Sequence, residues 1–116
     1  MTEEERVVRE YFEAQARWDA DALPGIVSKD FTLGPFKSCA ELQEAWRDPY
    51  DHLEEDMVVE SVELEGLKPV VRWRSELRWR HDGSLAATQT VVTRHTVVGG
   101  RITAIQLVES SGWQRT

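Results

Sequence analysis

The sequence has a single cysteine, Cys39, among its 116 residues. One thiol cannot form an internal disulfide, and it cannot supply the set of thiolates that holds a structural zinc ion. Asp48, Asp51, His52, Glu54, Glu55 and Asp56 form an acidic cluster with one histidine, and solvated loop charge explains such a cluster better than a metal site. We therefore expect neither a metal nor any other cofactor.

Long apolar runs and an excess of positive charge are also missing. No segment reaches the roughly 18 apolar residues of a membrane span, and the start of the chain has none of the features of a signal peptide. The net charge of −7 opposes binding to nucleic acid. With 41% apolar residues and five tryptophans, the chain is expected to form one globular domain over 1–116, located in the cytoplasm.

Apolar and charged residues alternate from Val70 to Arg80, which predicts a strand with one buried face and one wet face. A similar pattern over 57–65 predicts a strand before it. Asp82-Gly83 and Gly99-Gly100 predict two-residue hairpin turns after it, and hence three consecutive antiparallel strands.

A two-residue turn at Asp82-Gly83 pairs His81 with Ser84 and so determines which side chains share a face. Ser75 then lies opposite Thr90, and His95 points outward. A one-residue slip would move a whole strand to the other face. The predicted inner face contains Val71, Trp73, Ser75, Leu77, Thr88, Thr90, Val92, Arg94, Ile105, Leu107 and Glu109.

The first half of the chain is predicted to be mostly helical. Tyr11, Gln15 and Trp18 recur at helical spacing in a segment from Thr2 to about Asp19. Shorter helices should begin at Asp21 and at Ser38-Cys39-Ala40-Glu41, which has the sequence of a capping box, with a short strand over 31–33 between them. Helices followed by an antiparallel sheet indicate an α+β fold.

This order of elements, with Asp30-Phe31-Thr32-Leu33-Gly34-Pro35-Phe36 before the capped helix, resembles the nuclear transport factor 2-like superfamily. Its members include SnoaL-like cyclases, ketosteroid isomerases, scytalone dehydratase and limonene epoxide hydrolase. The resemblance covers nearly the whole chain. It implies a curved antiparallel sheet wrapped around a long N-terminal helix, a cone-shaped α+β barrel with an open apolar cone.

The catalytic residues of these relatives are mostly missing. Tyr11 matches the tyrosine of ketosteroid isomerase, but the two aspartates of that enzyme fall on Gly34 and near Val92. The Asp-Arg-Asp set of limonene epoxide hydrolase and the two inward histidines of scytalone dehydratase have no counterpart on the predicted inner face. The resemblance therefore indicates a fold and not a reaction.

Three polar residues are candidates for catalysis. Glu109 could act as an acid or base in an apolar cone, or it could be a solvated carboxylate at a strand end. Arg94 could bind an oxyanion, or it could form an ion pair with Glu60. Tyr11 could place a phenol at the pocket floor, or it could be part of the core.

A small apolar or aromatic molecule is the expected ligand. The residues expected to line its site are Gln15, Trp46, Trp73, Ser75, Thr88, Thr90, Val92 and Leu107, although the tryptophans could equally fill the cone. On the outer face, apolar residues suggest a homodimer interface, namely Val91, Val97, Ile102, Ala104 and Val108. The expected function is a SnoaL-like small-molecule-binding domain. The alternatives are a cofactor-independent cyclase, isomerase, dehydratase or hydrolase using Glu109, Arg94 and Tyr11, and a non-catalytic dimerisation or protein-binding module.

Overall fold

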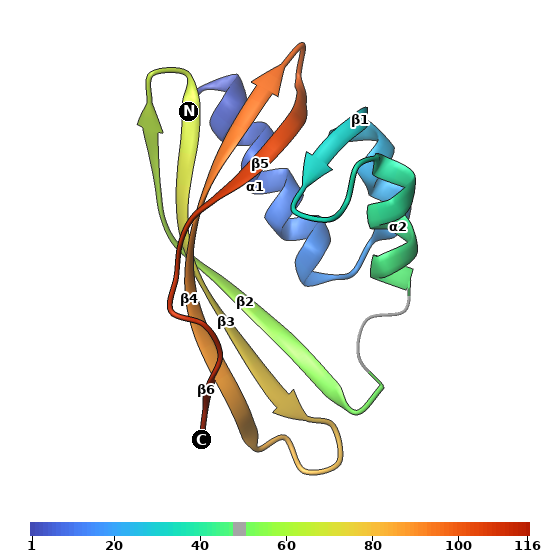
Figure 1. The fold of residues 1–116 in the computed structure, drawn as a ribbon, viewed down its shortest axis with the longest axis vertical. Coiled ribbons are helices and arrows are strands. Elements are labelled where there is room, and N and C mark those ends of the chain that lie inside the picture. Colours follow the sequence, from blue (N-terminus) through green and yellow to red (C-terminus); the bar gives the residue numbers. More distant parts are fainter. Residues whose placement is uncertain (48–50) are drawn as a thin grey trace.

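The computed structural model describes residues 1–47 and 51–116, and its elements follow the predicted order of helices and then strands (Figure 1). The helical elements are α1 (Glu3–Ala16), the short 3₁₀ helix η1 (Ala20–Gly25) and α2 (Cys39–Arg47). The strands are β1 (Val27–Leu33), β2 (Leu53–Glu65), β3 (Lys68–Trp79), β4 (Leu85–Val98), β5 (Arg101–Ser110) and β6 (Gln114–Arg115).

The sheet has the strand order β1-β5-β4-β3-β2, and the short β6 pairs with β4. Helix α1 lies against one side of this curved, unclosed sheet, and α2 lies beside β1 (Figure 1). The α+β fold with a curved sheet around the N-terminal helix is therefore confirmed. One edge differs from the prediction, because β1 runs parallel to β5 and makes the sheet mixed.

Helix α1 begins as predicted and ends earlier. The Thr2 side chain accepts a hydrogen bond from the backbone N–H of Glu5, which caps the helix. The helix stops at Ala16 instead of reaching Asp19, and Trp18 has a left-handed φ of 51° that no α-helix contains. The turn of chain after Ala16 leads directly into η1.

The Ser38 hydroxyl accepts a hydrogen bond from the N–H of Glu41, so the predicted cap of α2 is present. The Glu41 carboxylate accepts from the N–H of Lys37, one residue earlier than a standard capping box would have it. The cap fixes where α2 leaves the loop that follows β1. This loop, which contains Gly34 and Pro35, forms part of the candidate site.

The β3–β4 hairpin differs from the prediction in a way that decides the site. Its loop spans the four residues 80–83, closed by the hydrogen bond from the Trp79 N–H to the Ser84 carbonyl. Arg78 then pairs with Leu85 but Leu77 pairs with Ala87, which leaves Ala86 as an extra residue in β4. An extra residue of this kind is a β-bulge, and it exchanges the two faces of the strand beyond it.

The β4–β5 hairpin begins with the predicted pair of Val98 and Arg101. Two register shifts then follow in β5, and they place Glu109 opposite Val92 instead of Thr90. In the β2–β3 hairpin Glu65 pairs with Lys68, so the turn is Gly66-Leu67 and Val71 pairs with Val62; a register shift at Glu60 lies farther along the two strands. The predicted pairings were therefore wrong both where a turn differed from the expected one and where a bulge intervened.

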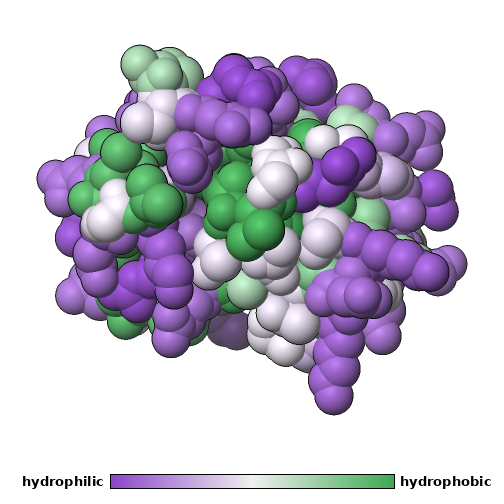
Figure 2. Space-filling view, turned by 90° about the horizontal axis from the view of Figure 1, so that it is seen from above, coloured by the Kyte–Doolittle hydropathy of each residue, from purple (hydrophilic) through white to green (hydrophobic). Residues whose placement is uncertain are grey.

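The core lies between α1 and the concave side of the sheet and continues under β1 and α2. Its largest fully buried side chains include Phe31, Leu23, Ile102 and His95. Seen from above, the end of the molecule that holds two hairpin turns is mainly hydrophilic, with separate apolar groups (Figure 2). In the described part of the chain, no helix has the length and apolar character needed to cross a membrane.

Candidate functional site

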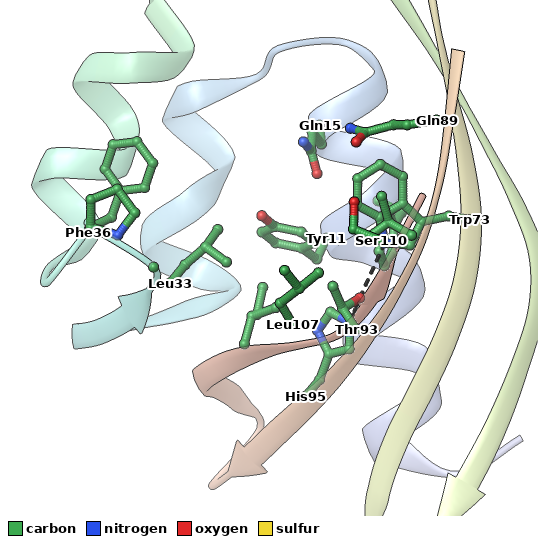
Figure 3. Close-up of a pocket in the computed structure, with 15 residues that line it drawn as sticks. Tyr11, Gln15, Leu33, Phe36, Trp73, Gln89, Thr93, His95, Leu107 and Ser110 are labelled. Atoms are coloured by element: carbon green, nitrogen blue, oxygen red, sulfur yellow. Dashed lines mark hydrogen bonds between the residues drawn. The ribbon is translucent and has the colours of Figure 1, made fainter. Parts of the chain in front are cut away.

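A cavity of about 370 Å³ opens between α1, the loop after β1, and strands β3 to β5. We call it the histidine lobe, because His95 lies in its wall. Its remaining walls are mostly apolar, and Figure 3 shows side chains from the helix, the loop and the sheet surrounding the same space. The apolar lining includes Phe12, Leu33, Pro35, Phe36, Trp73, Val91, Ile105 and Leu107.

A short hydrogen-bond chain stiffens the wall formed by the sheet. The indole N–H of Trp73 donates to the Thr93 hydroxyl over 3.2 Å, and this hydroxyl lies 2.9 Å from Nε2 of His95. Because the hydroxyl accepts from Trp73, its own proton is available for Nε2, which favours the His95 tautomer protonated at Nδ1. Nδ1 is buried and has no hydrogen-bond partner among the described residues.

His95 is uncharged in this setting. It is 0% exposed, and burial lowers its pKa to about 3 because an imidazolium there would lose its hydration. The rings of Tyr11 and Phe12 lie against it, with centroids 6.3 and 5.7 Å from the imidazole. Burial also raises the pKa of Tyr11, so the lobe presents a neutral phenol and a neutral imidazole at physiological pH.

A second cavity, of about 450 Å³, adjoins the first and shares Tyr11, Gln15, Leu33, Phe36 and Gln89 with it. We call it the glutamate lobe, since Glu55 of β2 lies in its wall. The other residues that line it are Trp18, Leu42, Ala45, Trp46 and Trp113. Trp113 comes from the segment between β5 and β6, and β6 continues along β4 in the same direction as β5.

Glu55 is a partly buried carboxylate held by the sheet. The Ser75 hydroxyl, which is fully buried, donates a hydrogen bond to Oε2 of Glu55. Burial raises the pKa of Glu55, and the bond from Ser75 opposes this by stabilising the charged form. The cavity therefore contains a carboxylate that is more easily protonated than a solvated one.

Three further polar groups are free to meet a ligand. The hydroxyl of Tyr11 and the amides of Gln15 and Gln89 make no hydrogen bond to the protein within 1–47 and 51–116. All three residues line both lobes. The side chains of Gln15 and Gln89 extend toward each other at one end of the cavity (Figure 3).

Part of the predicted site is brought together. Tyr11, Gln15, Trp73 and Leu107 line the histidine lobe, and Trp46 lines the glutamate lobe. Leu107 lies at the rim, with 61% of its surface exposed. Ser75 also points inward, where it supports Glu55.

The predicted inward placement of five other residues was wrong. The bulge at Ala86 turns Thr88, Thr90, Val92 and Arg94 to the outer face, where they lie opposite Glu76, Arg74, Arg72 and Val70. Glu109 follows Val92 to that face through the register shift in β5. None of the five lines either lobe.

The outer positions of Arg94 and Glu109 have ordinary ion-pair partners. Arg94 contacts Glu65 at 3.1 Å, not the predicted Glu60. Glu109 lies 3.8 Å from Arg72 with 68% of its side chain exposed. A role for these two residues in the chemistry of the cavity is therefore excluded by their position.

The predicted apolar patch does not form on the outer face, because three of its five residues belong to or pack against the core. Val91 and Ile102 are buried, and Val97 packs against the core. The same change of parity explains this result, because it turns apolar residues inward and polar residues outward. Much of the outer face is charged, because Arg72 pairs there with Glu109 and Arg78 pairs with Asp56 and Glu76.

The remaining candidates have structural explanations. Cys39 is buried in the first turn of α2, and burial raises its pKa, as expected for an unreactive thiol. In the acidic cluster, Glu54 and Asp56 are exposed and pair with arginines, and Asp48 lies outside the described residues. No group of three metal-ligating side chains occurs in the described part of the chain.

Sequence reasoning missed Glu55, Gln89, Thr93 and His95. The bulge at Ala86 turns Gln89, Thr93 and His95 inward. The local sequence predicts the Asp-Gly turn but contains no comparable signal for the bulge. Glu55 had a usable signal. It alternates with Met57 and Val59, which both pack on the core, so a strand starting at Leu53 instead of Met57 would have turned it inward.

Comparison with known sequences gave no match, either to a protein-family model or to a curated protein. Solved structures match over almost the whole chain. An LEH-like epoxide hydrolase from M. tuberculosis superposes with a TM-score of 0.73 at 15% identity, covering 90% of this chain and 80% of that one. A candidate polyketide cyclase from Acidithiobacillus ferrooxidans gives 0.79 at 12% identity, covering 96% and 89%.

A SnoaL-like polyketide cyclase from Agrobacterium tumefaciens gives a TM-score of 0.75 at 8% identity, with 93% of this chain and 91% of that chain covered. Identities this low carry no information about substrate or reaction. They do agree with the helix, sheet and cavity described above. The chain therefore has the nuclear transport factor 2-like fold.

Proposed function

We propose that residues 1–116 form one SnoaL-like domain that binds a small apolar or aromatic molecule in the histidine lobe. One observation carries the proposal: an apolar cavity of about 370 Å³ is lined by polar groups that are held neutral or left without a protein partner. Ligand sites typically occupy about 300–1,000 Å³ and combine apolar walls with a few polar groups.

The walls of the histidine lobe favour a neutral, flat group in the part of the ligand that lies there. Aromatic rings of Phe12, Phe36 and Trp73 offer contact area on three sides. Among the described residues that line this lobe, none offers a counter-ion to a charged group, and burial lowers the pKa of the His95 imidazole itself. The free amides of Gln15 and Gln89 could orient a hydroxyl or carbonyl of the ligand.

Blocking the rim of the cavity tests this proposal. Ser110 lines the lobe and is exposed, so Ser110→Phe should obstruct entry while leaving the core intact. Isothermal titration with the neutral probe 1-naphthalenemethanol should show binding to the wild type and at least about tenfold weaker binding to the variant. Gln106→Phe, an exposed position on the outer face opposite Arg94, is the matched control. No binding to the wild type, or equal loss in both variants, would contradict the proposal.

Catalysis without a cofactor is a second candidate, and Glu55 is the observation that favours it. Its carboxyl has a raised pKa, so it could act as a proton donor, and the phenol of Tyr11 in the same lobe could donate a hydrogen bond to the reacting oxygen. Incubation with uncharged epoxides, followed by mass spectrometry, would detect hydrolysis to diols. Activity that survives in both Glu55→Gln and Tyr11→Phe would contradict this assignment.

We also propose that the chain forms a homodimer through the outer face of the sheet. The support is the charge of that face, where Arg72 lies near Glu109 and Arg94 near Glu65, and these side chains could pair with a second copy. Static light scattering gives the mass directly. A strict monomer at high protein concentration would remove the proposal.

A cytoplasmic location stays a prediction.

A further inference from the structure

The glutamate lobe differs from the rest of the cavity in combining one acid with several large aromatic rings. Trp18, Trp46, Trp113 and Tyr11 all line it, and Glu55 is its only acidic or basic side chain among the described residues. The ring of Trp46 lies 5.7 Å from that of Tyr11 and 6.1 Å from that of Trp18, between centroids. The rings of Tyr11, Trp46 and Trp18 therefore form one contiguous aromatic wall.

Such rings attract cations. The face of an aromatic ring carries negative charge density, and it attracts an ammonium group within about 6 Å of its centroid, indole most strongly. Three of the chain's five tryptophans line this one lobe. The inclined rings of Trp18 and Trp46, at 87° to each other, present surfaces in more than one direction.

The carboxylate of Glu55 lacks a partner for its charge. Ser75 donates a hydrogen bond to Oε2, and no other hydrogen bond or ion pair to the Glu55 side chain occurs within the described residues. A partly buried carboxylate without a counter-ion is costly, whereas a ligand cation beside it would recover much of that cost. The neighbouring acids Glu54 and Asp56 already have arginine partners.

We propose that the glutamate lobe binds the ammonium group of an organic cation whose apolar body lies in the histidine lobe. The inference rests on the proposed function, because it assigns the head group of the molecule that the histidine lobe would hold. The two lobes share five lining residues, so one ligand can span them. An inorganic divalent ion is a poor occupant, since it requires several oxygen ligands.

Three ligands with the same ring and different head charges test the inference. 1-Naphthalenemethylamine is a cation at pH 7.5, 1-naphthalenemethanol is neutral, and 1-naphthoic acid is an anion. Titration calorimetry of the wild type should rank them cation, neutral, anion, with the cation at least about tenfold tighter than the alcohol, as expected for combined ring and carboxylate contacts.

Two variants locate the effect. Glu55→Gln should abolish the preference for the amine while leaving the affinity for the alcohol within about twofold. Glu54→Gln, an exposed acid one residue away with 62% of its side chain accessible, should keep the preference and controls for net charge. Trp113→Leu should weaken the amine more than the alcohol.

The outcomes separate the two proposals. Binding of the alcohol with no advantage for the amine would overturn the cation site and leave the proposed function standing. Failure of the alcohol to bind would overturn the proposed function. An amine preference that persists in Glu55→Gln, or that is lost equally in Glu54→Gln, would overturn the assignment to Glu55.

Discussion

The two lobes of the cavity treat an ionisable group in opposite ways, although they share a wall. In the histidine lobe a base is fully buried and its pKa is lowered. In the glutamate lobe an acid is partly buried and its pKa is raised. Both shifts have the same leading cause, because burial always disfavours the charged form. The cavity therefore favours neutral groups unless a partner compensates a charge.

Acidification should produce the largest effect, because it forces a charge into the histidine lobe. His95 binds a proton at a pKa near 6.5 when unfolded and near 3 when folded. Between these values the unfolded state binds more protons, so the free energy of unfolding falls as pH falls. From pH 7 to pH 4 this one group should cost about 3 kcal/mol.

Urea unfolding of the wild type and of His95→Gln at both pH values checks this. The difference between the two proteins isolates His95 from the carboxylates that titrate in the same range. A wild type that loses no more stability than the variant would show that His95 is not a buried neutral base.

Thr93→Val should have the next largest effect. It removes the hydroxyl between the Trp73 N–H and Nε2 of His95 and should cost about 1–3 kcal/mol, because two buried polar groups lose their partner. Thr90→Val makes the same chemical change on the outer face and should stay within about 0.5 kcal/mol. Equilibrium unfolding measures both, and a reversed order would restore the register expected from the turn.

Ser75→Ala should act on the glutamate lobe alone. It removes the hydrogen bond to Glu55, at a cost of about 1 kcal/mol, and should raise the pKa of Glu55 further. Because the bond favours the ionised carboxylate, the cost should be greater at pH 8 than at pH 4. NMR titration of the Glu55 carboxyl carbon measures the pKa. Ser61→Ala, on the outer side of β2 opposite Arg72, is the control.

Glu109→Gln should have the smallest effect. Its only ion pair within the described residues is with Arg72, at 3.8 Å and largely exposed to solvent, and such pairs contribute about 0–1 kcal/mol. Thermal unfolding and titration with 1-naphthalenemethanol should both match the wild type. Loss of ligand binding in this variant would mean that Glu109 reaches the cavity after all.

The fold was predictable because its signals are local. A few neighbouring residues are enough to predict the cap at Ser38, the strand around Trp73 and the Gly99-Gly100 turn. The site was only half predictable. Tyr11 and Gln15 follow from helical spacing, which tolerates small errors at the ends of a helix.

Residues on β4 do not have that tolerance. A strand has a period of two, so the single extra residue at Ala86 changed the face of every residue beyond it. The bulge is supported from a distance, since the carbonyl of Ala86 accepts a hydrogen bond from the N–H of Thr116. A contact across 30 residues is not visible in the local sequence, and this is why His95 was expected outside and lies inside.

The two lobes of the cavity, and the roles assigned to the residues that line them, all depend on the register between β3 and β4. NMR cross-strand contacts between backbone protons measure it directly. The structure predicts contacts from Trp73 to Val91 and from Ser75 to Gln89, together with contacts between the rings of Tyr11 and His95. Contacts from Trp73 to Val92 and from Ser75 to Thr90, with none between the two rings, would contradict it.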